Sequence, residues 1–77
     1  MQYYFLMPVA YFNKHYTQYL GGLVFHREHT NGTEKIIKVD GKKYKGWLDA
    51  YLKQNPCPEL KEITEAEAHD NMAPIKN

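Results

Sequence analysis

Residues 2–12 read Q-Y-Y-F-L-M-P-V-A-Y-F, and this stretch contains almost no polar side chain. A strand that is half-exposed to water alternates apolar and polar residues, because successive side chains point to opposite faces of the sheet. Here apolar residues occupy odd positions, such as Phe5 and Val9, and also even positions, such as Leu6 and Phe12. Both faces of the predicted strand therefore need cover, and a short chain has little to cover them with.

Pro8 interrupts this apolar stretch. Proline has no backbone N–H to donate to a neighbouring strand, so Pro8 predicts an edge strand, a bulge or a break. An edge strand with two apolar faces pairs readily with another chain. We therefore expect a partner protein, or a homodimer formed through residues 2–12.

The length of 77 residues predicts one domain, which we place at residues 1–72, with residues 73–77 as a frayed tail. Cys57 is the only cysteine, which fits a reducing compartment. Residues 2–12 lack the charged and small-residue flanks of a secretory signal and are too short to cross a bilayer as a helix. These features favour a cytoplasmic protein that does not enter the membrane.

The middle of the sequence predicts a hairpin. Strands are expected at residues 23–28 and 33–39, joined by a type I′ turn centred on Asn31-Gly32. Residues 42–44 form a short fourth strand in this interpretation. Residues 14–20, which follow the possible cap Asn13, are either a short helix or a tyrosine-rich loop, and both readings stay open.

The clearest helix is expected at residues 46–55, because apolar residues recur there at helical spacing. Gly46 is its expected N-cap, Pro56 prevents its continuation, and Trp47 is expected in the core. Residues 64–67 form a capping box that begins a short acidic helix, too poor in apolar residues to seal the second sheet face. The predicted fold is α+β: a small antiparallel, meander-like sheet of three to four strands packed on one main helix, with a short C-terminal helix.

The sequence offers little that points to catalysis, metal binding or a cofactor. His26 and His29 stand three residues apart, which puts them on opposite faces of a strand, and the paired ligand spacings of zinc sites are missing. Cys57 lies between two prolines with no helix N-terminus behind it to lower its pKa. We therefore expect no enzyme activity, no catalytic residue, no metal ion and no cofactor.

The distribution of charge leaves nucleic-acid binding as an alternative. The net charge is +1, but residues 35–58 carry six lysines against two aspartates, and residues 59–77 carry five acidic residues against two lysines. Lysines beside an aromatic ring can follow a phosphate backbone while bases stack on the ring. The residues expected to do so are Lys42, Lys43, Tyr44 and Lys45.

The aromatic content favours protein binding as the main hypothesis. Seven of the eleven aromatic residues lie within the first 19 positions, more than a small core is expected to enclose. Tyrosine is enriched at interfaces because one end of its side chain can be dry and the other wet. The residues expected to contact a partner are Tyr4, Tyr11, Tyr16 and Tyr19.

No family motif is present that can be carried over residue by residue. In its size, its aromatic content and its lack of catalytic groups, the chain resembles the very short accessory proteins and inhibitors encoded by phages and other mobile elements. This resemblance implies a non-enzymatic protein that occludes a surface of its partner, as an inhibitor or an assembly factor.

Overall fold

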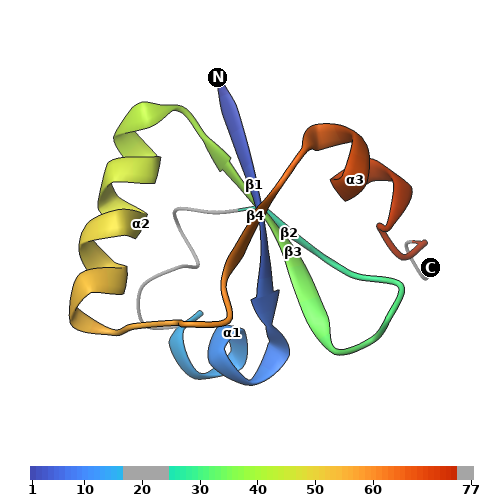
Figure 1. Ribbon diagram of the computed structural model, residues 1–77, viewed down its shortest axis with the longest axis horizontal. Coiled ribbons are helices and arrows are strands. Elements are labelled where there is room, and N and C mark those ends of the chain that lie inside the picture. The colour runs from blue at the N-terminus through green and yellow to red at the C-terminus, as the bar shows by residue number, and fades with distance from the viewer. Residues whose placement is uncertain (17–24, 75–77) are drawn as a thin grey trace.

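The computed structural model describes residues 1–16 and 25–74, which form an antiparallel sheet with helices on both of its faces (Figure 1). The four strands of the sheet lie in the order β2-β3-β1-β4. This arrangement confirms the expected α+β fold class. The elements in chain order are β1 Gln2–Pro8, α1 Val9–His15, β2 Phe25–Glu28, β3 Glu34–Asp40, α2 Lys42–Gln54, β4 Lys61–Ile63 and α3 Glu65–Asp70.

Strand β1 occupies the middle of the sheet, so the strand order is not that of a simple meander. It pairs with β3 along its whole length, from Gln2 opposite Asp40 to Pro8 opposite Glu34. On its other side it pairs with β4, where Tyr4 lies opposite Ile63. The expectation of an edge strand was therefore wrong, because Tyr4–Leu6 of β1 are paired with a strand on each side.

The α2 side of the sheet carries the larger core cluster. Phe5 and Met7 of β1 lie beside Ile37 of β3 on this face, since paired residues of neighbouring strands point to the same side. Leu48 of α2 and Phe12 of α1 pack onto them, and both are buried. In Figure 1 the sheet is seen nearly edge-on, with α2 on one side and α1 below its end.

The opposite face of the sheet is covered by α3, which Figure 1 shows on the other side from α2. Tyr4, Ile36 and Ile63 form the sheet side of this second cluster, and Ala68 is the buried residue that α3 contributes. Helix α3 covers β1 on this face, so the expectation that it is too poor in apolar residues to seal the face was wrong for β1, although Phe25 of β2 stays 54% exposed. A small alanine lets the helix backbone approach the sheet closely, and the sheet itself supplies the large apolar side chains.

Pro8 ends β1 and precedes α1, so its missing N–H breaks the strand rather than marking an edge. The chain turns there, and Val9 N donates to Thr33 O at 3.2 Å. Residues 9–12 are therefore helical and not part of the strand. Of the segment 14–20, left open between helix and loop, Lys14 and His15 end this helix, and residues 17–20 lie outside the described residues. In α1, Phe12 and Tyr16 stand one turn apart and their rings stack at 4.7 Å between centroids.

Helix α2 also begins earlier than expected, at Lys42 instead of after Gly46. Residues 42–44 are thus its first turn and not a fourth strand. Gly41 takes the N-cap position with a φ of +92°, a left-handed conformation that favours glycine. The helix ends at Gln54, before Asn55 and Pro56, in agreement with the prediction.

The hairpin between β2 and β3 was predicted correctly, but its turn is not of type I′. That type needs a positive φ at both central residues, and only Gly32 has one, at +75°. Instead, Gly32 N donates to His29 O at 3.0 Å, and the Asn31 side chain accepts from Thr33 N at 2.9 Å. The predicted capping box of α3 is confirmed, since Glu67 N donates to Thr64 Oγ1 at 3.1 Å.

The chain beyond α3 returns to the hairpin. Thr30 N donates to Asn71 O, and Ala73 N donates to Glu28 O, both at 2.9 Å. Met72 forms a β-bridge with His29 between these two bonds. Ala73, which was expected to begin a frayed tail, is thus held by a backbone hydrogen bond, and residues 75–77 lie outside the described residues.

The close approach of α3 can be tested by enlarging Ala68. Ala68→Leu adds three heavy atoms at a fully buried position, which should lower the free energy of unfolding by about 1–3 kcal/mol. Ala66→Leu on the exposed side of the same helix is the matched control, and should change it by less than about 0.5 kcal/mol. Urea unfolding of both variants checks this, and equal effects would contradict the packing of α3 described above.

Candidate binding surface

Tyr4, the first of the tyrosines expected to contact a partner, belongs to the core. Its side chain is 4% exposed under α3, and its hydroxyl donates to Gln2 Oε1 at 3.0 Å. Burial, together with the nearby carboxylates of Glu65 and Asp40, raises the pKa of Tyr4 above its usual value. The prediction that Tyr4 is available to a partner therefore does not hold in this fold.

Tyr11 connects α1 to the C-terminal end of α2. Its hydroxyl donates to Asn55 O at 2.5 Å, and its ring lies against the ring of His15 at 4.1 Å between centroids. Burial, and then the proximity of Cys57 and Tyr51, raises the pKa of Tyr11 to about 12. A half-buried tyrosine with a bonded hydroxyl fixes two helices to each other.

Tyr16 lies at the end of α1, where its ring stacks on Phe12 and meets the edge of His26 at 5.0 Å between centroids. It is half-buried. Tyr19 lies outside the described residues. Tyr11 and Tyr16 pack against the α2-side core cluster and Tyr4 against the α3-side cluster, so the structure does not bring these three into one surface patch.

The most exposed aromatic rings come from other parts of the chain. Phe25 of β2 is 54% exposed, Trp47 is 45% exposed and Tyr44 is 37% exposed. The expectation that Trp47 lies in the core was wrong, because the adjacent Leu48 points inward instead. Sequence reasoning missed Trp47 since the apolar positions of α2 span a wide stripe, and spacing alone does not say which edge of the stripe is covered.

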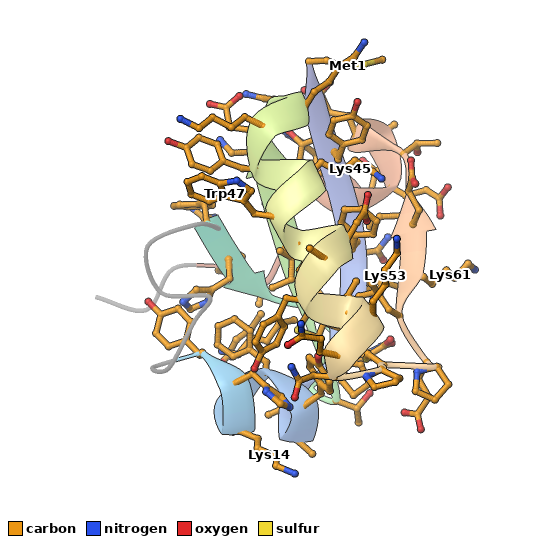
Figure 2. The ribbon with its side chains drawn as sticks, turned by 90° about the vertical axis from the view of Figure 1, so that its left-hand side faces the viewer. Met1, Lys14, Lys45, Trp47, Lys53 and Lys61 are labelled. Atoms are coloured by element: carbon orange, nitrogen blue, oxygen red, sulfur yellow. The ribbon has the colours of Figure 1, made fainter. Side chains whose placement is uncertain are left out.

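Tyr44, Trp47 and Lys43 lie together on the outer side of α2, and Lys42 precedes them in the first turn of the helix; we name these four residues the α2 aromatic surface. The Tyr44 ring meets the Trp47 ring edge-on at 5.6 Å, and Lys43 Nζ lies 5.3 Å from the Trp47 ring centroid. Figure 2 looks onto α2 and shows Trp47 on the side of β2, with Lys61 of β4 on the other side.

Lys45 was expected to act with Lys42 and Lys43, but it is engaged elsewhere. Its ammonium bonds to Asp49 Oδ2 at 3.0 Å, one turn along the helix, and lies 5.3 Å from the Tyr3 ring centroid. The hydrogen bond to Asp49 raises the pKa of Lys45. The lysines next to Tyr44 are therefore of two kinds, one paired with a carboxylate and two exposed.

The first turn of α2 carries an unusual concentration of positive charge. It contains no acidic residue, and no side chain caps its free N–H groups. Helix N-termini carry a partial positive charge of their own, so Lys42 and Lys43 add to a positive potential instead of balancing it. This end of the molecule favours the approach of a negatively charged surface.

The histidines and the cysteine do not gather into a reactive site. In residues 1–16 and 25–74, no group of three or more His, Cys, Asp or Glu side chains is placed to hold a metal ion. His26 packs against both Phe12 and Tyr16, whereas His29 Nδ1 accepts from Asn31 N at 2.9 Å. Burial raises the pKa of the Cys57 thiol, which disfavours the reactive thiolate.

Among the described helices, none combines the length and the apolar character needed to span a bilayer. Comparison with known proteins gives no relative: no family model, no curated protein and no solved structure matches the chain. The candidate surface therefore rests on its own geometry.

His26 gives the fold a pH dependence that can be measured. Burial, and then the charge of Lys35, lowers the pKa of His26 below its usual 6.5, so the folded state binds a proton less readily than the unfolded chain. The stability from neutral His26 is fully present above about pH 6.5 and is lost as the pH falls toward the folded-state pKa. The melting temperature should therefore decrease between pH 7.5 and 5.5.

His26→Phe keeps a ring against Phe12 and Tyr16 and removes the titrating group, so it should flatten this decrease. His69→Phe changes an exposed histidine that lies 3.7 Å from Glu65 and is the matched control. Scanning calorimetry at several pH values measures both slopes. A slope unchanged in His26→Phe would show that other groups cause the acid sensitivity.

Proposed function

We propose that the protein is a non-enzymatic interaction module that binds a negatively charged surface of a partner protein through the α2 aromatic surface. The observation that supports this most directly is the exposure of Trp47, the largest side chain of the molecule, on the outside of α2. If nothing bound there, burying this ring would make the fold more stable, as the burial of the adjacent Leu48 does.

The residue types on this surface are those that carry binding energy in protein interfaces. Tryptophan and tyrosine dominate binding hot spots because they bury a large apolar area with few rotatable bonds. Lysine is depleted at interface centres, and Lys42 and Lys43 flank the rings, as expected at a polar rim. Charges at a rim speed association with a partner of opposite charge more than they add to affinity.

The proposal keeps the expected class of function but moves its centre from the tyrosine-rich N-terminal third to α2. Tyr11 and Tyr16 are half-buried, and a contribution of their exposed edges to the interface stays a prediction. We further propose that the partner lies in the cytoplasm and that binding occludes part of its surface, in the manner of a phage-type accessory protein or inhibitor. Homodimerisation is one form that such an interface could take, and sedimentation across a concentration series tests it.

Removal of both rings should abolish partner binding without unfolding the protein. The variant Tyr44→Ala with Trp47→Ala should lose at least tenfold in affinity, since hot-spot truncations cost about 2 kcal/mol or more. The free energy of unfolding should change by less than about 1 kcal/mol, since both rings are substantially exposed. Quantitative affinity capture from the native host, followed by titration of the purified partner, measures the loss.

Lys61→Gln is the matched control, because Lys61 is exposed on β4, away from Trp47 (Figure 2). It should retain the same partner at the same recovery. A partner that binds the double variant as well as it binds the original protein would contradict the proposal. So would a double variant that fails to bind only because it is unfolded in circular dichroism.

Nucleic-acid binding through Lys42, Lys43, Tyr44 and Lys45 remains the alternative for this surface. It is favoured by one observation: among the described residues, no carboxylate lies within ion-pair distance of Lys42 or Lys43. Binding of this kind weakens steeply with salt, with a logarithmic slope of about 0.7 per phosphate contact on a single strand. Lys42→Gln with Lys43→Gln should reduce that slope by about 1.4 in an anisotropy titration, and an unchanged slope would remove this alternative.

A further inference from the structure

The α3 side of the sheet is only partly covered. Helix α3 packs over β1 and β4, where Ala68 contacts Tyr4 and Ile63 in the second core cluster. Ile36 of β3 is buried in the same cluster, but at the β2 edge of this face the Phe25 ring is 54% exposed. An open groove with a cavity volume of about 420 Å³ lies there, between the strands and α3.

The register of the strands places an aromatic ring and two cations together on the floor of this groove. Phe25 lies opposite Lys38, and Arg27 lies two residues further along β2 on the same face. Lys38 Nζ is 5.2 Å from the Phe25 ring centroid. Arg27 and Lys38 are diagonal neighbours across two strands, which puts their Cβ atoms about 7–8 Å apart.

Neither cation is neutralised within the described residues. No carboxylate lies within ion-pair distance of Arg27 or Lys38, whereas Lys35 on the other face of β3 is 3.5 Å from Glu28. Both Arg27 and Lys38 are half-buried, so an anion bound to them would be less screened by water than one bound to exposed lysines. A planar guanidinium is suited to bidentate contacts with phosphate oxygens.

The rim of the groove is fixed by hydrogen bonds. Met72 forms part of the wall, and it is held by the two 2.9 Å backbone bonds that join residues 71–73 to the hairpin. The α3 wall carries Glu65 and His69, whose side chains are 3.7 Å apart. A phosphate is repelled by Glu65, so it is expected on the β2–β3 side, where the two cations lie.

We infer that this groove binds a nucleotide, with the base stacked on Phe25 and the phosphate held by Arg27 and Lys38. A planar base needs an exposed aromatic face, and stacking on such a face tolerates any base. The adjoining phosphate needs positive charge within one nucleotide's length of the ring, which the register supplies. The nucleotide is either free or part of a single strand, since both present the same base and phosphate.

This site is separate from the α2 aromatic surface, because the two lie on opposite faces of the sheet (Figure 1). The result of a binding test at this site therefore has no bearing on the proposed protein interface. It also differs from the alternative nucleic-acid surface at Lys42–Lys45, and variants of the two sites distinguish them.

The test is a binding titration of the full chain at low salt with two probes: a fluorescein-labelled decamer of deoxythymidine, followed by anisotropy, and adenosine monophosphate, followed by calorimetry. Phe25→Ala should weaken decamer binding at least about fivefold, the lower end of what one stacked base contributes. Arg27→Gln with Lys38→Gln should weaken it further and reduce the logarithmic salt slope by about 1.4. Lys53→Gln with Lys61→Gln removes two exposed lysines that belong to neither surface, and it is the matched control that should leave both unchanged.

Phe25→Trp keeps the inference open to refutation if Phe25→Ala unfolds the chain. Tryptophan also stacks on bases, so this variant should bind at least as well as the original protein. In a Trp47→Phe background its fluorescence should be quenched by the decamer. Stronger binding of the decamer than of the mononucleotide assigns the site to single strands, and equal binding assigns it to a free nucleotide. Absence of binding by both probes, or loss of binding only in Lys42→Gln with Lys43→Gln, the variant of the alternative surface on α2, would overturn the inference.

Discussion

The position of β1 between β3 and β4 is the constraint on which the rest of this structure depends. A strand that is apolar on both faces is stable only where both faces are covered, and here one chain does this alone. The α2 side is covered by Leu48 and Phe12, and the α3 side by Ala68. The apolar surplus of residues 2–12 is therefore explained by a central place in a three-layer fold, without a second chain.

The small amount of helix in the chain also determines which surfaces stay accessible. Helix α3 has six residues and leaves the β2 edge of its face uncovered, so Phe25 and the groove beside it stay open. Helix α2 has thirteen residues and can bury only one side of its wide apolar stripe, which leaves Tyr44 and Trp47 outside. Both candidate binding surfaces thus arise where a short helix meets more apolar surface than it can cover.

The sequence correctly predicted those elements that depend on interactions between residues close to one another in the chain. The β2–β3 hairpin, the end of α2 before Pro56 and the capping box at Thr64 each depend on residues that are close in sequence. The place of β1 does not, because Pro8 is compatible with an edge, a bulge or a break, and pairing with Asp40 or Ile63 is set by distant parts of the chain. The exposure of Trp47 was likewise unpredictable, since it depends on the angle at which α2 meets the sheet.

The tyrosines show why aromatic content alone misleads about function. Tyr4 fills the core and Tyr11 joins two helices through its hydroxyl, so their abundance near the N-terminus reflects packing. The two most exposed aromatic rings of the described residues each have a lysine ammonium near the ring, as the less exposed Phe12 and Tyr3 also do. Lys43 lies over Trp47 and Lys38 over Phe25.

A lysine stem laid across an exposed ring shields apolar surface from water while its charge stays hydrated. Binding of an anion to the ammonium would move the lysine away from the ring. The uncovered face of the ring would then be free to contact a flat or apolar part of the same ligand. A ligand that offers an acidic group and a flat or apolar group together is then favoured over one that offers either alone. The same argument applies to both proposals, the partner surface at α2 and the nucleotide beside β2.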